Sequence, residues 1–78
     1  MIDYQNLKQN YVTALHMGIM MNASYEEAKR GNDVLHKFCE NCIENSNYSE
    51  QDKQRMKHDL ELLKESLAQG IEQRFLGK

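Results

Sequence analysis

Proline and tryptophan are both absent from this chain of 78 residues, and glycine occurs only four times. Without proline, no position imposes a break on helical hydrogen bonding. Few glycines leave little of the permissive backbone that loop-rich folds use. Long unbranched residues such as Lys, Glu, Gln, Leu and Met are common, and these lose little side-chain freedom in a helix. The composition therefore predicts an all-α fold.

Long apolar runs, many cysteines and a strong charge of either sign are also missing. The apolar stretch over 12–21 is interrupted by Thr13 and His16, and no stretch approaches the ~20 apolar residues that span a bilayer. Two cysteines are too few for a disulfide scaffold and suit a reducing compartment. The net charge is −2, whereas nucleic-acid binding usually requires a basic domain. We therefore expect a cytoplasmic protein with neither a membrane nor a nucleic acid as its partner.

Hydrophobic periodicity divides the chain, which has the length of one domain (1–78), into three helical segments. We expect helices over about 3–21, 24–45 and 49–75. Ser24 and Glu27 form the Ser-x-x-Glu pattern of a capping box, and Ser49 is placed to cap the third segment. Apolar residues recur at steps of three and four, as one packed helix face requires. These stripes comprise Tyr4, Leu7, Tyr11, Ala14, Gly18 and Met21, then Ala28, Gly31, Leu35, Phe38 and Cys42, then Met56, Leu60, Leu63, Leu67 and Gly70.

The short turn before the third segment predicts an antiparallel hairpin of the second and third helices, with the first helix packed against it. Folding about this turn places Leu35 near Leu60. It also places Gly31 near Leu63 and Lys64, so that a small residue lets the second and third backbones approach. A three-helix domain of this size buries a limited core, and assembly into an oligomer would supply the missing burial.

The stretch LHKFCENC, over 35–42, raises the possibility of a redox pair or a metal site. A reactive thiol of the redox type sits at a helix N-terminus, but Cys39 lies deep inside the second segment. Zinc requires convergent ligands, usually four. The candidate ligands are His36, Cys39, Cys42 and His58, of which the first three spread around one helix. We interpret the cysteines as small core residues and expect no cofactor, with a metal-stabilised domain as the lesser alternative.

Tyr4 and Tyr11 lie seven residues apart on one helix face, with Lys8 between them. Their rings can cover the hairpin while their hydroxyls reach water. The alternative is a small-ligand site in which the two rings stack a nucleotide-like molecule and Lys8 contacts it. Paired catalytic carboxylates, a phosphate-cradling glycine loop and a nucleophile set in a pocket are not evident in the sequence, so we predict that the protein is not an enzyme.

The end of the first segment, LHMGIMM over 15–21, is apolar on every side. Successive helical residues step by about 100°, so its apolar side chains project in nearly every direction. They are Leu15, Met17, Ile19, Met20 and Met21. A hairpin covers only one side of such a helix, and methionine is common where surfaces adapt to partners. We predict that this end contacts a protein partner or another copy of the chain. The alternative is that a tilted first helix inserts between the other two and is covered internally.

Together these features predict a small, non-enzymatic regulatory, adaptor or inhibitor protein that acts by helix-to-helix contact and self-association. In size and number of helices the chain is similar to small helical adaptors, secretion co-chaperones and phage-encoded inhibitors. The runner-up is a small-ligand binding protein with a nucleotide-like molecule at a subunit junction.

Overall fold

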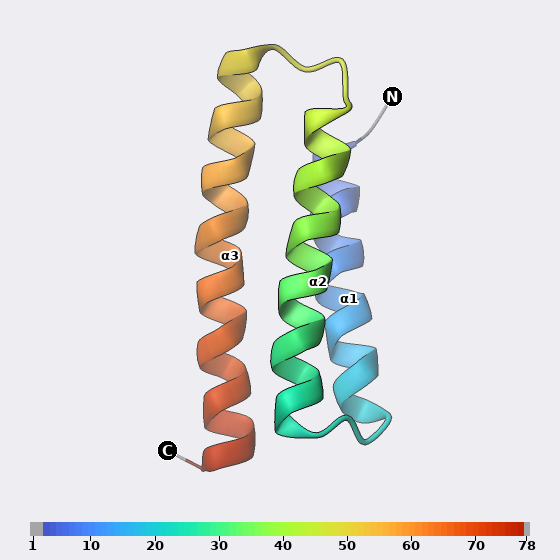
Figure 1. The fold of residues 1–78 in the computed structure, drawn as a ribbon, viewed down its shortest axis with the longest axis vertical. Helices are drawn as coiled ribbons and strands as arrows, with labels where there is room; N and C mark the ends of the chain where they lie inside the picture. The colour runs from blue at the N-terminus through green and yellow to red at the C-terminus, as the bar shows by residue number, and fades with distance from the viewer. Residues whose placement is uncertain (1–2, 78) are drawn as a thin grey trace.

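The computed structural model describes residues 3–77, and within them three α-helices and no strand are formed. Helix α1 spans Tyr4–Met20, α2 spans Tyr25–Glu44 and α3 spans Glu50–Leu76. Because every bound lies within one residue of the expected one, the all-α, three-helix prediction is confirmed. The chain runs down α1, up α2 and down α3, so α1 and α3 point the same way (Figure 1).

Polar side chains at the helix starts fix these bounds. The Ser24 hydroxyl accepts a hydrogen bond from the Glu27 backbone N–H at 3.1 Å, and the Glu27 carboxylate accepts one from the Ser24 N–H at 2.8 Å. This reciprocal pair is the predicted capping box. Ser49 caps α3 in the same way on its first turn. Helix α3 ends at Gly77, whose φ of 68° is the left-handed conformation that glycine adopts without strain.

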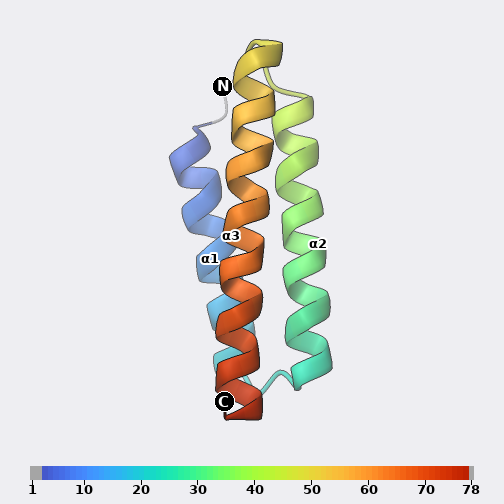
Figure 2. The ribbon, with the colours of Figure 1, turned by 90° about the vertical axis from the view of Figure 1, so that its left-hand side faces the viewer.

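The core runs along α2, which packs against both other helices (Figures 1 and 2). Burial of its apolar side chains away from water is the main favourable term in the folding of this chain. The buried apolar residues come from all three helices and are Tyr11, Leu15, Ala28, Cys39, Ile43, Leu60 and Ile71. Leu15 packs with Ala28 and Ile71 at one end, while Tyr11 packs with Ile43 and Leu60 towards the other.

The register of the α2–α3 hairpin agrees with the prediction, but one residue faces the other way. Asn32 Nδ2 donates to the Lys64 carbonyl at 3.1 Å, and Lys64 Nζ pairs with Asp33 at 3.1 Å. Gly31 was expected to let α3 approach, and this is wrong. A Cβ added at Gly31 would meet Leu15 Cδ1 of α1 at 3.8 Å, so the small residue lies at the α1–α2 contact instead.

A buried polar network joins all three helices. The Tyr11 hydroxyl on α1 donates to the side-chain oxygen of Asn32 on α2, and the Asn32 amide donates to the Lys64 carbonyl on α3. Both Tyr11 and Asn32 are almost fully buried. Because buried polar groups are costly unless paired, this network favours one arrangement of the three helices over alternatives with shifted registers.

Candidate functional site

Helix α2 buries a different face from the predicted one, and this difference creates the candidate site. Its buried residues are Ala28, Asn32, His36, Cys39 and Ile43. The predicted stripe of Ala28, Gly31, Leu35, Phe38 and Cys42 is therefore turned partly away from the core. Phe38 is 59% exposed, whereas polar Asn32 and His36 are buried. The bundle thus leaves a large aromatic ring outside while it encloses an amide and an imidazole.

The side chains left outside gather on one surface, which we name the α1–α2 face. Its members are Ala14, Met17, Gly18 and Met21 from α1 and its C-terminal cap, and Phe38 from α2. Because Tyr11 and Leu15 point into the core, Ala14 and Gly18 lie on the α2 side of α1, with the two methionines beyond them. Phe38, Met17 and Met21 are 59%, 56% and 78% exposed. Val34 is exposed too, but it lies with Arg30 on the outer side of α2.

Two hollows lie side by side within the α1–α2 face. A hollow of about 80 Å³ is bordered by Ala14, Gly18 and Gly31. A larger hollow of about 210 Å³ is bordered by Ala14, Leu35 and Phe38. Buried residues, Leu15 and Ala28 in the smaller hollow and Tyr11 and Cys39 in the larger, form the floor. The surface therefore presents both a recess and projecting side chains of the same apolar character.

Charge is scarce on the α1–α2 face. Among the residues that line its two hollows, Glu27 is the one with a charged side chain. Its carboxylate accepts the Ser24 backbone N–H, and this hydrogen bond lowers the pKa of Glu27 below its ordinary value. A carboxylate already committed to capping α2 costs less to cover than a free one.

Gly18 has no requirement from its own chain. Its φ is not positive, and a Cβ at this position would meet nothing within 4 Å among the residues that the structure describes. A helical glycine costs about 1 kcal/mol relative to alanine. That cost is unexplained within the single chain. It would be offset if another backbone came close at Gly18.

The five residues predicted to contact a partner divide into three groups. Leu15 is buried within the chain, so it is a core residue and is not available to a partner. Ile19 is half-buried and borders hollows on both sides of α1. Met17 and Met21 belong to the α1–α2 face, whereas Met20 is 65% exposed and lies on the opposite side of α1 from Tyr11. The alternative of internal coverage therefore fails for all three methionines.

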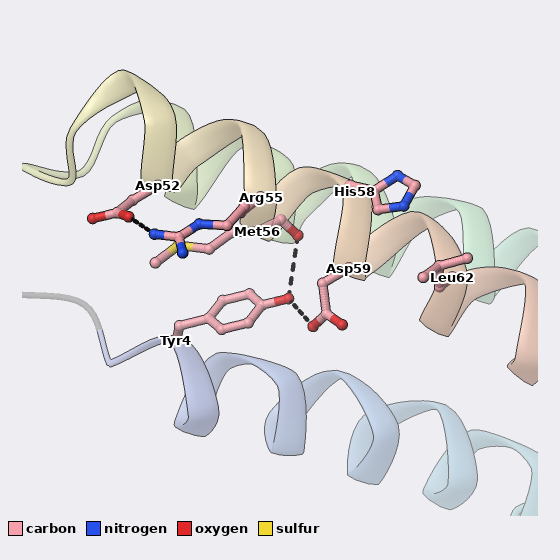
Figure 3. A pocket seen from close by; sticks show the side chains of 7 residues that line it. All are labelled: Tyr4, Asp52, Arg55, Met56, His58, Asp59 and Leu62. Carbon is pink, nitrogen blue, oxygen red and sulfur yellow. Dashed lines mark hydrogen bonds and ion pairs between the residues drawn. The ribbon is translucent and has the colours of Figure 1, made fainter.

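The predicted stacking platform does not form, because its tyrosines are engaged elsewhere. Tyr11 is 1% exposed, and burial raises its pKa above the ordinary value. The Tyr4 hydroxyl donates to Asp59 Oδ2 at 2.5 Å and lies 3.2 Å from the Met56 carbonyl (Figure 3). Lys8 Nζ pairs with the same Asp59 oxygen at 2.9 Å. Tyr4, Lys8 and Tyr11 border three different hollows, so they do not surround one ligand.

The residues weighed as metal ligands are also spread apart. Cys39 and His36 are buried, Cys42 is half-buried and His58 lies at the surface, bordering the hollow shown in Figure 3. Over residues 3–77, no three His, Cys, Asp or Glu side chains are placed to hold a metal ion. Burial, with a smaller contribution from Cys42, raises the pKa of the Cys39 thiol to about 11. A thiol that stays protonated at neutral pH is a poor nucleophile.

Sequence reasoning missed the buried polar residues Asn32 and His36. The His36 Nδ1 lies 3.8 Å from Glu40 and its Nε2 lies 3.7 Å from Glu61. Periodicity places Ala28, Asn32, Leu35, Cys39 and Ile43 on one face as readily as the predicted stripe. The signal that was overlooked is that Ile43 belongs only to this second set.

Comparison of the chain with protein-family models, curated proteins and solved structures gives no match. No helix within residues 3–77 combines the length and the apolar character that crossing a bilayer requires.

Proposed function

We propose that this protein is a non-enzymatic helical adaptor or inhibitor that acts through protein contact and associates with itself through the α1–α2 face. One observation carries the proposal. Met17, Met21 and Phe38 are more than half exposed, and all three lie on the α1–α2 face. Contiguous apolar surface of this kind on a small protein marks an interaction site.

The composition of the α1–α2 face supports a protein as the occupant. The centres of protein interfaces are depleted in charge and enriched in aromatic residues and methionine. Phe38, Met17 and Met21 supply these residue types, and the two hollows between α1 and α2 offer recesses for side chains from the other side. A second copy brings the same charge-poor surface, so no like charges are forced together across a symmetry axis.

The size of the α1–α2 face sets the expected strength of association. Helix α2 has 20 residues, which corresponds to about 30 Å, and two packed helices are about 20 Å wide. The flat area is therefore about 600 Å² per copy, or about 1,200 Å² for two. This value is at the lower end of the range for specific interfaces, so we expect a reversible dimer that forms at micromolar concentration or above.

A pair of methionine variants tests the proposal. Met17→Glu places a charge in the α1–α2 face, while Met20→Glu makes the same change on the other side of α1. We expect the native chain and Met20→Glu to dimerise and Met17→Glu to remain monomeric, as measured by sedimentation equilibrium. Far-ultraviolet circular dichroism would confirm that both variants keep their helices.

Two results would overturn the proposal. A native chain that stays monomeric at several hundred micromolar would exclude self-association. Equal dimerisation of Met17→Glu and the native chain would exclude the α1–α2 face as its site. If both Met17→Glu and Met20→Glu prevented dimerisation, the interface would include both sides of the C-terminal end of α1, as predicted from the sequence.

A further inference from the structure

A second, separate surface follows the seam between α1 and α3, which we name the α1–α3 groove. Both helices pack closely along α2, but their backbones approach each other at few positions. Three hollows follow one another along this seam. The first is bordered by Tyr4 and Met56 (Figure 3), the second by Lys8 and Leu63, and the third by His16 and Arg74. The groove therefore extends over most of the length of α1.

The floor of the α1–α3 groove is apolar, and its most enclosed hollow lies near the C-terminal ends of the two helices. There a hollow of about 260 Å³ is bordered by Val12, Ile19 and Leu67, with Ile71 beneath. Val12 is 39% exposed, and Ile19 and Leu67 are half-buried. Gly70 borders the same hollow, and a Cβ at this position would meet nothing within 4 Å among the described residues. Space thus remains for side chains that come from outside the chain.

Three cationic side chains, Lys8, Arg55 and Arg74, and two carboxylates border the groove, whereas the whole chain carries −2. No glutamate borders any of the three hollows. The two aspartates that do are already paired, Asp52 with Arg55 and Asp59 with Lys8. Arg74 borders the hollow of about 260 Å³ and makes no ion pair within residues 3–77. Glutamates instead lie along α2 and α3 where these helices meet, as in the Glu44–Lys57 pair.

We propose that the α1–α3 groove binds an acidic amphipathic helix from a different protein. An apolar stripe on that helix would cover Val12, Ile19 and Leu67, and its carboxylates would pair with Arg74 and meet His16. A helix in this seam completes a four-helix bundle, in which it runs antiparallel to α1 and α3. In that direction the first turn of the docked helix lies beside Arg74, where acidic residues also favour the helix dipole.

The groove and the α1–α2 face lie on different sides of α1, so this inference does not depend on self-association. Together the two surfaces would allow one chain to bind another copy of itself and a second protein at the same time. The combination is what an adaptor requires.

A synthetic peptide of about 18 residues, matched to the 17 residues of α1, tests the groove. It carries leucine at the apolar positions of a single helix face, glutamate on both flanks and a fluorescent label. A control peptide has lysine in place of every glutamate. Anisotropy titration against the full chain should show micromolar binding of the acidic peptide, which added salt weakens. The basic peptide should bind at least tenfold more weakly.

Two pairs of variants locate the bound peptide. Arg74→Glu should weaken binding roughly tenfold, while Arg30→Glu makes the same charge change on the outer side of α2 and should leave it unchanged. Gly70→Leu fills the hollow of about 260 Å³ and should abolish binding. Gln69→Leu adds the same side chain at an exposed position of α3 and should leave binding unchanged. Replacing glycine by leucine favours the helix, so a loss at Gly70 would not reflect unfolding.

Several outcomes would overturn the inference. They are failure of the acidic peptide to bind, equal binding of the basic peptide, and equal effects of Arg74→Glu and Arg30→Glu. If Gly70→Leu instead prevented self-association without any peptide, the groove would be occupied by a second copy, which also contradicts the inference. Met17→Glu should bind the acidic peptide normally. Loss of self-association through the α1–α2 face and loss of peptide binding in the groove can therefore be measured separately.

Discussion

Asn32 and Tyr11 show how single polar residues set the arrangement of the helices. Asn32 accepts from Tyr11 on one side and donates to the Lys64 carbonyl on the other. A net buried hydrogen bond contributes only about 1 kcal/mol, whereas a buried group left without its partner costs about 1–3 kcal/mol. The pair therefore acts mainly against wrong arrangements, because any shift in register would leave both groups buried and unpaired.

At this scale we predict that Tyr11→Phe lowers the free energy of unfolding by about 1–3 kcal/mol, because the side-chain oxygen of Asn32 loses its donor. Tyr4→Phe should cost less, since Tyr4 is half-buried and water can replace its hydroxyl. Urea denaturation followed by circular dichroism measures both. In the double variant Tyr11→Phe with Asn32→Leu, the losses should be less than additive. Full additivity would show that the two side chains are not coupled.

At the scale of the element, α1 is the helix whose exposed surface is least polar. Tyr11 and Leu15 bury one side, while Met17, Gly18 and Met20 remain outside. At the same end of the bundle, α2 and α3 contact each other directly. There Tyr25 donates to Glu72, and its ring lies 6.0 Å from that of Phe75. Helices α1 and α3 each contribute two buried apolar residues and α2 contributes three, while α1 takes part in both proposed contacts.

Gly18→Ala separates the stability of α1 from its association. At dilute concentration we expect the free energy of unfolding to rise by about 1 kcal/mol, because the added methyl group meets nothing within 4 Å. Sedimentation at high concentration should show weaker self-association, since the methyl group keeps the partner's backbone at a distance. Gly70→Ala should bring the same gain in stability without any change in association. A Gly18→Ala dimer as tight as the native one would contradict close approach at this position.

At the scale of the whole molecule, folding places several groups where only their neutral form is well accommodated. Burial raises the pKa of Cys39 from 9.0 to about 11. Burial is also the largest cause of the raised pKa values of Tyr4 and Tyr11. In the unfolded chain these groups lose their protons near their ordinary pKa values. Rising pH therefore favours the unfolded state. The contribution of Cys39 is lost between about pH 9 and 11, and that of the two tyrosines is lost as the pH rises above 10.

We accordingly predict that the urea midpoint stays constant from about pH 7 to 8.5 and falls steadily above about pH 9. Cys39→Ala removes one of the groups responsible, so its midpoint should fall less over the same range, although it starts lower because a buried side chain has been shortened. Cys42→Ala, which alters a half-buried residue, should follow the native profile closely. A native midpoint that rises or stays level above pH 9 would show that these groups titrate normally in the folded chain.

Local features of the sequence predicted the helices well, because they depend on near neighbours along the chain. The capping box at Ser24 and Glu27, the cap at Ser49 and the left-handed Gly77 each act within a few residues of themselves. The direction of each buried face was harder to predict. Two possible buried faces of α2 share Ala28 and Leu35 and differ by less than one step around the helix, and periodicity alone does not choose between them.

Interactions between near neighbours along the chain define three helices and their ends. Which apolar residues go inside depends instead on contacts between residues far apart in the chain, so it follows only from the way the helices pack. Packing both α1 and α3 on α2 buried Asn32 with its two partners and turned Phe38 outwards. The same packing left the seam between α1 and α3 open, and no local pattern in the chain indicates a groove that two distant helices form together.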